Sequence, residues 1–192
     1  RAAARPDAAA IIDGPRALTY RELNQSANTL ARRLSGSGLT RGALALVRMP
    51  RSSDLAIVLL AVLKAGASYA WTEPGSVEDT GPCAAFCIRR GHRDAEERYL
   101  AIDIESALRD SIARPGPNLP VLSRGSDVAC VLPDCGGRPH VLVPHATIAA
   151  LPLASAQRRS WDGSIGALDL WLGLMSGATL ALGAPPAVTA AA

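Results

Sequence analysis

Apolar residues recur at helical spacing near the start of the chain. They place one face of a helix on the positions Leu23, Ala27, Leu30 and Leu34. Thr19 and Glu22 precede this face in a capping-box pattern, in which each side chain can accept a hydrogen bond from the other residue's backbone N–H. The pattern therefore predicts a helix that begins after Thr19 and ends at Gly36 or Gly38.

Further along, short apolar runs alternate with helix patterns. The runs predict strands at residues 44–49, 68–72, 83–88, 99–104, 127–132, 141–143 and 178–182. The helix patterns cover residues 55–64, 145–153 and 168–175. The first of these can be capped by Ser53, and it is apolar almost all round, so we expect it to be buried between two layers. This alternation indicates an α/β fold with a mainly parallel sheet flanked by helices, in which 127–132 and 141–143 form a hairpin.

Composition is that of one globular domain. Hydrophobic residues make up 48% and charged residues 19%, and the 20 basic and 17 acidic residues give a net charge of +3. The basic residues form no stripe of the kind that binds nucleic acid. The apolar runs are shorter than the ~20 residues that span a bilayer, and no signal peptide is evident. We expect a cytoplasmic location, without nucleic acid or membrane as a partner.

The two ends of the sequence resemble the limits of a segment. It starts at Arg1 without methionine and finishes in an alanine-rich stretch at residues 184–192. Such composition is typical of a linker. We therefore expect one domain over residues 1–183, followed by a tail or linker over 184–192, within a longer polypeptide.

The four cysteines do not indicate a metal site. No zinc motif matches the spacing of these cysteines, which are Cys83, Cys87, Cys130 and Cys135. In a reducing compartment we expect them to be small, buried or half-buried side chains. The sequence thus predicts neither a metal nor a cofactor.

Two motifs in fixed order resemble a known family. Residues 18–23 read Leu-Thr-Tyr-Arg-Glu-Leu, and residues 60–69 read Leu-Ala-Val-Leu-Lys-Ala-Gly-Ala-Ser-Tyr, followed by Glu73 and Pro74. They resemble the first two signatures of the adenylation domains of nonribosomal peptide synthetases, within the acyl-adenylate-forming superfamily. The resemblance implies the fold of the N-terminal subdomain of such a domain. Both signatures are structural and carry no chemistry.

Residues 133–140 stand where the family has its phosphate loop. The family pattern is Thr-Ser-Gly-Thr-Thr-Gly-x-Pro-Lys-Gly, whereas this chain reads Pro-Asp-Cys-Gly-Gly-Arg-Pro-His and is about two residues shorter. The flanks at 127–129 and 143–145 do resemble the family, including His145. The resemblance implies a vestigial phosphate loop, whose positions are Asp134, Cys135, Gly136, Gly137, Arg138 and His140.

This loop is poorly suited to a triphosphate. A phosphate loop aims successive backbone N–H groups and a lysine at the anion. Pro133 has no N–H, Asp134 adds a negative charge, and His140 in the lysine-like place is largely neutral at pH 7, since its ordinary pKa is about 6.5. We expect ATP to bind weakly at best.

A fourth motif resembles the substrate pocket of the family. Residues 161–164 read Trp-Asp-Gly-Ser, like the family's Phe-Asp-x-Ser, in which the aspartate binds the amino group of the amino acid. The spacing between Asp162 and Asp169 differs from the family's, and residues 145–161 are too few for the usual pocket wall. Asp162 is therefore a vestigial substrate-pocket position, with a helix N-cap or an exposed loop as its structural interpretation.

The resemblance ends after residues 178–182. No counterpart follows for the family's adenine site, hinge or C-terminal lid with its lysine. We expect a truncated, degenerate adenylation domain, a catalytically inactive remnant without catalytic residues. An incomplete sheet should also leave an unpaired edge or an apolar face near 178–182.

Three hypotheses for function follow. In the first, the chain is a non-catalytic scaffold or docking domain, whose 168–175 helix or final strand contacts a condensation-type or carrier-type domain. In the second, it is the first half of an interrupted adenylation enzyme that sequence elsewhere completes. In the third, the eroded pocket became a ligand-binding or regulatory site.

Overall fold

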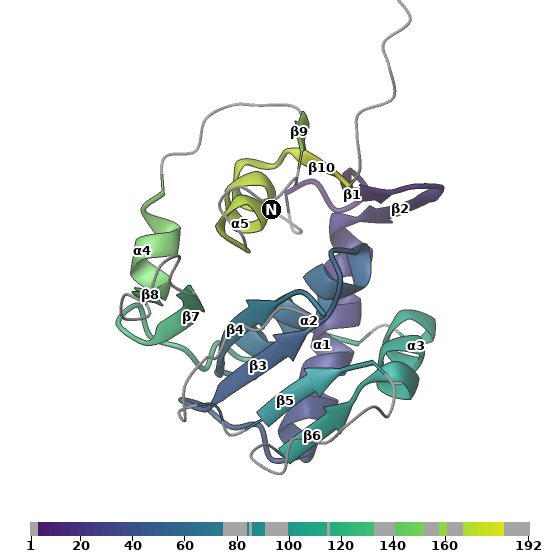
Figure 1. The fold of residues 1–192 in the computed structure, drawn as a ribbon. Helices are drawn as coiled ribbons and strands as arrows, with labels where there is room; N and C mark the ends of the chain where they lie inside the picture. The colour runs from purple at the N-terminus through teal and green to yellow at the C-terminus, as the bar shows by residue number, and fades with distance from the viewer. Residues whose placement is uncertain are drawn as a thin grey trace, which may run out of the picture.

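The structure is a computed structural model with two sheets. It describes residues 4–74, 84, 86–90, 100–114, 116–132, 141–151, 158–160 and 167–182. The larger sheet has six strands in the order β6-β5-β3-β4-β7-β8 (Figure 1). Their bounds are β3 Leu44–Arg48, β4 Ser68–Thr72, β5 Phe86–Arg89, β6 Leu100–Asp103, β7 Val128–Leu132 and β8 Val141–Pro144. All neighbours are parallel except β7 and β8, which confirms the predicted parallel sheet and hairpin.

Helices α1 (Tyr20–Gly36) and α2 (Ser53–Lys64) pack against each other. The predicted capping box starts α1: the Thr19 N–H donates to Glu22 Oε2 over 2.8 Å, and the Glu22 N–H donates to Thr19 Oγ1 over 3.1 Å. The cap of α2 is Ser52 rather than the predicted Ser53, because the Ser52 hydroxyl accepts from the Leu55 N–H over 3.1 Å. That bond requires an extended backbone at the cap, which Ser52 has.

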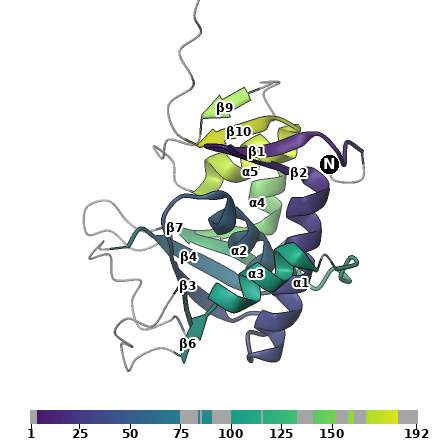
Figure 2. The same cartoon turned by 90° about the vertical axis from the view of Figure 1, so that its right-hand side faces the viewer.

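A third helix, α3 (Glu105–Ala113), packs beside α1 (Figure 2). It was not predicted, since its cap is Ile104 and no side chain makes a capping bond from that position. Beyond α3 the chain crosses α1 as an irregular segment that contains Pro117 and Pro120. Asn28 Nδ2 donates to the Gly116 carbonyl over 3.1 Å, and Arg32 donates to the Pro117 carbonyl over 2.7 Å. Side chains of α1 thus replace the hydrogen bonds of regular structure.

The second sheet has the order β2-β1-β10-β9 and joins the two ends of the described chain. Its strands are β1 Ala9–Asp13, β2 Arg16–Thr19, β9 Arg158–Ser160 and β10 Thr179–Leu182. β10 lies between β1 and β9 and is parallel to both. The expectation of an unpaired edge at 178–182 is therefore wrong. The physical reason is that β1, a short strand that the sequence patterns missed, pairs with β10.

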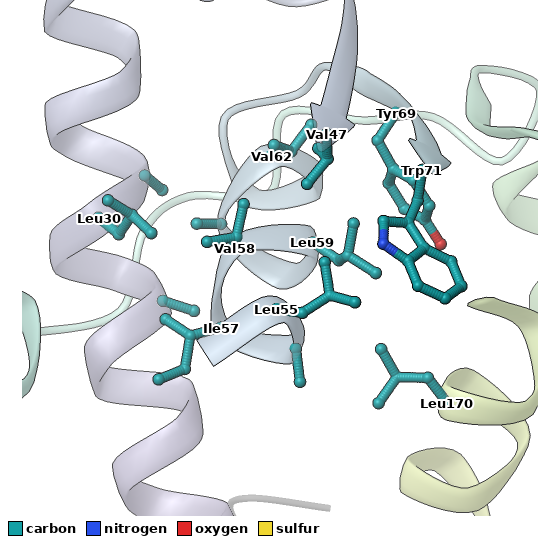
Figure 3. Close-up of a cluster of buried hydrophobic side chains, with 14 of the residues drawn as sticks. Leu30, Val47, Leu55, Ile57, Val58, Leu59, Val62, Tyr69, Trp71 and Leu170 are labelled. Atoms are coloured by element: carbon teal, nitrogen blue, oxygen red, sulfur yellow. The ribbon is translucent and has the colours of Figure 1, made fainter. Parts of the chain in front are cut away.

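The short helices α4 (His145–Ala149) and α5 (Ala167–Ser176) complete the fold. α4 ends at Ala149, earlier than the predicted position 153. The core lies where α2 meets the large sheet and α5, and Figure 3 shows Leu55 and Leu59 of α2 near Trp71 and Leu170. No helix in the described ranges combines the length and apolarity that crossing a bilayer requires.

Most of the predicted core is confirmed. Burial is complete or nearly so for Leu23, Leu30, Leu34, Leu55 and Leu59. Leu60 and Leu63, predicted to be core as well, are half-buried. They line a cleft between helices, so one side of α2 is not covered by a packed layer.

Candidate functional site

The phosphate-loop stretch leaves the carboxyl edge of the large sheet. β7 runs parallel to β4, with Tyr69 opposite Cys130 and Ala70 opposite Val131. In open α/β sheets this edge is where ligands bind. β7 ends at Leu132 and β8 begins at Val141, so the flanks of the loop lie where the resemblance places them. The predicted site positions themselves fall outside the described residues: Asp134, Cys135, Gly136, Gly137, Arg138, His140 and Asp162.

The neighbouring strand end is held by the protein's own groups. The Arg51 Nε atom lies 3.0 Å from Glu73 Oε1, and its guanidinium stacks over the Trp71 ring with 4.9 Å to the centroid. Trp71 in turn donates its indole N–H to the Met49 carbonyl over 2.9 Å. Arg51 therefore belongs to a structural cluster at the end of β4, in which Nε pairs with Glu73 and the guanidinium stacks on Trp71.

Carboxylates of the protein also occupy the N-terminus of α2, where the helix dipole favours negative charge. Asp13 Oδ2 accepts from the Ser53 N–H over 2.8 Å. The Asp54 carboxylate, with 10% of its side chain exposed, bridges Arg16 at 2.7 Å and Arg90 at 2.9 Å. This network ties the smaller sheet and the end of β5 to α2. Sequence reasoning missed it, because its members are far apart in the chain.

His145, which matches the family's histidine, begins α4. The backbone N–H of His145 donates to the Asp127 carbonyl over 3.0 Å. Burial lowers the pKa of the His145 imidazole, and the nearby Asp127 carboxylate opposes this effect. Asp127 itself has a lowered pKa, because it accepts from the Arg124 N–H and from Arg41, whose Nη2 lies 2.8 Å away. His145 is thus largely neutral at pH 7, a hydrogen-bonding group rather than a cation.

A cleft of about 560 Å³ lies between α1, α2, α4, α5 and residues 119–125. Its polar lining includes Asn24, Lys64 and His145. Lys64 donates to Asn24 Oδ1 over 3.0 Å, and burial, followed by the charge of Arg32, lowers the pKa of its ammonium group. The sequence motif around Lys64 is structural and gives no sign that this side chain lines a cleft.

The described thiols and acids form no metal site. Cys87 and Cys130 form no disulfide and are buried, as predicted, while Cys83 and Cys135 lie outside the described part. Desolvation raises the pKa of the Cys130 thiol to about 11, so it is protonated and unreactive at pH 7. Within the described ranges, no three His, Cys, Asp or Glu side chains come together as metal ligands.

Comparison with known proteins identifies the family. Residues 1–81 match the family described as AMP-binding enzyme. The chain is 32% identical to tyrocidine synthase 3 of Brevibacillus parabrevis over 160 residues, which are 74% of the chain and 2% of that protein. It is 29% identical to bacitracin synthase 1 of Bacillus licheniformis over 92% of the chain and 4% of that protein. The chain spans a small part of the length of these relatives.

Solved structures give the same result for the fold. The N-terminal subdomain of Klebsiella oxytoca NpsA, in complex with 3-hydroxybenzoyl-AMSN, superposes with a TM-score of 0.79 at 27% identity, over 96% of this chain and 52% of that one. The fused adenylation-PCP di-domain NpsA-ThdA gives a TM-score of 0.79 at 25% identity, over 96% and 38%. This chain belongs to the adenylation domains of nonribosomal peptide synthetases and corresponds to an N-terminal part of such a domain.

Proposed function

We propose that this domain is a non-catalytic structural member of a nonribosomal peptide synthetase, which holds condensation-type or carrier-type neighbours in place. One observation carries the proposal. The chain keeps the capped helix α1 and the buried core around α2, whereas residues 133–140 depart from the phosphate-loop pattern at the positions that would contact ATP. Selection for an adenylating enzyme would favour keeping both the core and the phosphate-loop pattern.

The electrostatics of the described edge support this proposal. An ATP site concentrates unpaired N–H groups and cations near the phosphates. Here Asp13 already accepts at the N-terminus of α2, Arg51 pairs with Glu73, and Pro133 and Asp134 stand at the start of the loop. A triphosphate at this edge would meet one added carboxylate and fewer donors than the family pattern supplies.

Ligand binding provides the first test. The NpsA N-terminal subdomain is described in complex with 3-hydroxybenzoyl-AMSN, so an N-terminal subdomain alone suffices to hold that ligand in NpsA. We expect calorimetric titration of this chain with ATP·Mg, and separately with 3-hydroxybenzoyl-AMSN, to show no binding at micromolar affinity. A micromolar dissociation constant corresponds to a binding free energy of about −8 kcal/mol. The NpsA subdomain is the positive control. A micromolar dissociation constant for ATP·Mg with this chain would contradict the proposal.

The exposed apolar side chains of β8 form a surface that suits contact with a neighbouring domain. β8 is the outermost described strand of the large sheet, next to β7. Val141 and Leu142 on it are 56% and 60% exposed. An outer strand with exposed apolar side chains is a site for contact with another domain, and an intramolecular interface typically covers about 600–1,500 Å².

The parent synthetase provides the second test. We expect deletion of residues 1–192 to impair product formation because the neighbouring domains lose their placement. Leu142→Glu should also lower product formation, because it brings a charge into the contact between β8 and a neighbouring domain. Point changes at Asp134, His140 and Asp162 should leave product formation nearly intact. Product yield by mass spectrometry, with the synthetase level checked by immunoblot, measures this. Loss of product in a well-folded Asp162→Ala synthetase would show that a working substrate site survives.

A further inference from the structure

The cleft between α1, α2, α4, α5 and residues 119–125 has the size and wall of a small-molecule site. Its volume of about 560 Å³ lies within the roughly 300–1,000 Å³ that is usual for such sites. The wall is mostly apolar and comes from separate helices: Leu60, Leu63, Ile148, Trp171, Leu174 and Met175. A ligand that fills it must have an apolar body.

Among the described residues, the charged side chains that line the cleft are basic. They are Lys64 and Arg124, and no aspartate or glutamate of the described ranges joins them. Lys64 is half-buried, and no carboxylate of the described residues pairs with it. A half-buried ammonium without a counterion is costly unless an anion or water solvates it. The ligand that suits this position carries a negative charge.

Neighbouring amides hold Lys64 in place. The Lys64 ammonium donates to Asn24 Oδ1 over 3.0 Å, and Asn24 Nδ2 donates to Asn118 Oδ1 over 2.8 Å. One of the three ammonium donors is therefore engaged, and the others are available to a ligand. His145, at the start of α4, adds a hydrogen-bonding group to the lining.

We propose that this cleft binds a small amphipathic carboxylate, whose apolar body packs between α2 and α5 while its carboxylate is held by Lys64. This goes beyond the structural role proposed above and does not depend on it. The site is distinct from the carboxyl edge of the large sheet, since its walls are α1, α2, α4, α5 and residues 119–125. Polar anchoring at one end and apolar contact elsewhere is the usual composition of a small-ligand site.

The test compares three probes that share one alkyl chain. Decanoate, decanol and decylammonium are titrated by calorimetry into the 192-residue chain, below their micelle concentrations. We expect decanoate to bind at least about tenfold more tightly than decylammonium, with decanol between them. Lys64→Met should weaken decanoate binding about tenfold and leave decanol unchanged, while Lys64→Arg should retain decanoate binding. Arg109→Met on α3, outside the cleft, is the matched control.

A blocking variant separates this site from nonspecific binding. Leu63→Trp fills the cleft and should abolish binding of decanoate and decanol, with the melting curve confirming that the variant is folded. Equal affinities for decanoate and decylammonium, or unchanged decanoate binding by Lys64→Met, would overturn the proposal. It also fails if none of the probes binds.

Discussion

Replacing Leu59 by alanine is expected to lower the free energy of unfolding by about 2–5 kcal/mol. Leu59 is completely buried in the core that α2 forms with the large sheet and α5. The substitution removes apolar contacts and leaves a cavity that the surrounding core closes only in part. In a domain of this size each kcal/mol shifts the melting temperature by about 2–4 °C. Calorimetry or thermal circular dichroism measures the change.

The control for Leu59→Ala is Leu100→Ala on β6. Leu100 is 58% exposed, so its truncation should change stability by no more than about 0.5 kcal/mol. If Leu59→Ala melts at the same temperature as the unsubstituted chain, α2 faces solvent, and the assignment of its signature to the family is then wrong as well.

Replacing Gly173 by alanine is expected to destabilise the domain, although alanine is the better helix former by about 1 kcal/mol. Gly173 lies in α5 where this helix meets β10, and a Cβ atom there would clash with the Leu180 side chain, at 2.9 Å from its Cγ. Leu180 is completely buried, so its side chain must shift within the core to admit a Cβ atom at position 173. Overpacking of this kind costs about 1–3 kcal/mol, which exceeds the gain in propensity.

Gly36→Ala is the matched control for Gly173→Ala. Gly36 ends α1, and a Cβ atom added there would have no heavy atom within 4 Å. This substitution should be neutral or stabilise by about 0.4–1 kcal/mol. Chemical denaturation measures whether each variant raises or lowers the free energy of unfolding. A stabilised Gly173→Ala would mean that α5 and β10 are further apart than described, whereas the double variant with Leu180→Val should recover stability if the clash is the cause.

Local signals predicted the elements that carry them. The capping box at Thr19 and Glu22 fixed the start of α1, and the apolar runs gave β3, β4 and the β7–β8 hairpin within about a residue. Elements without a local signal were missed. The N-cap of α3 is Ile104, which makes no side-chain capping bond, and β1 is a five-residue segment that pairs with β2 and β10.

The candidate site was less predictable than the fold. A motif indicates which residue types stand together, but burial depends on layers contributed by distant segments. Leu60 and Leu63 read as core because α2 is apolar all round, yet the short α4 leaves them at a cleft. Likewise, Asp54 and its partners Arg16 and Arg90 meet only in the folded chain.

The parallel pairing of β1 with β10 sets an order for folding during synthesis. Ile11 lies opposite Leu180, so β1 leaves the ribosome long before its partner exists. The β1–β2 hairpin, α1 and the β3-α2-β4 unit can form from local contacts while the chain grows. The smaller sheet must close last, across a loop that spans nearly the whole chain. Until then, β1 presents an open edge, and nascent chains that stall before β10 are those we expect to require a chaperone.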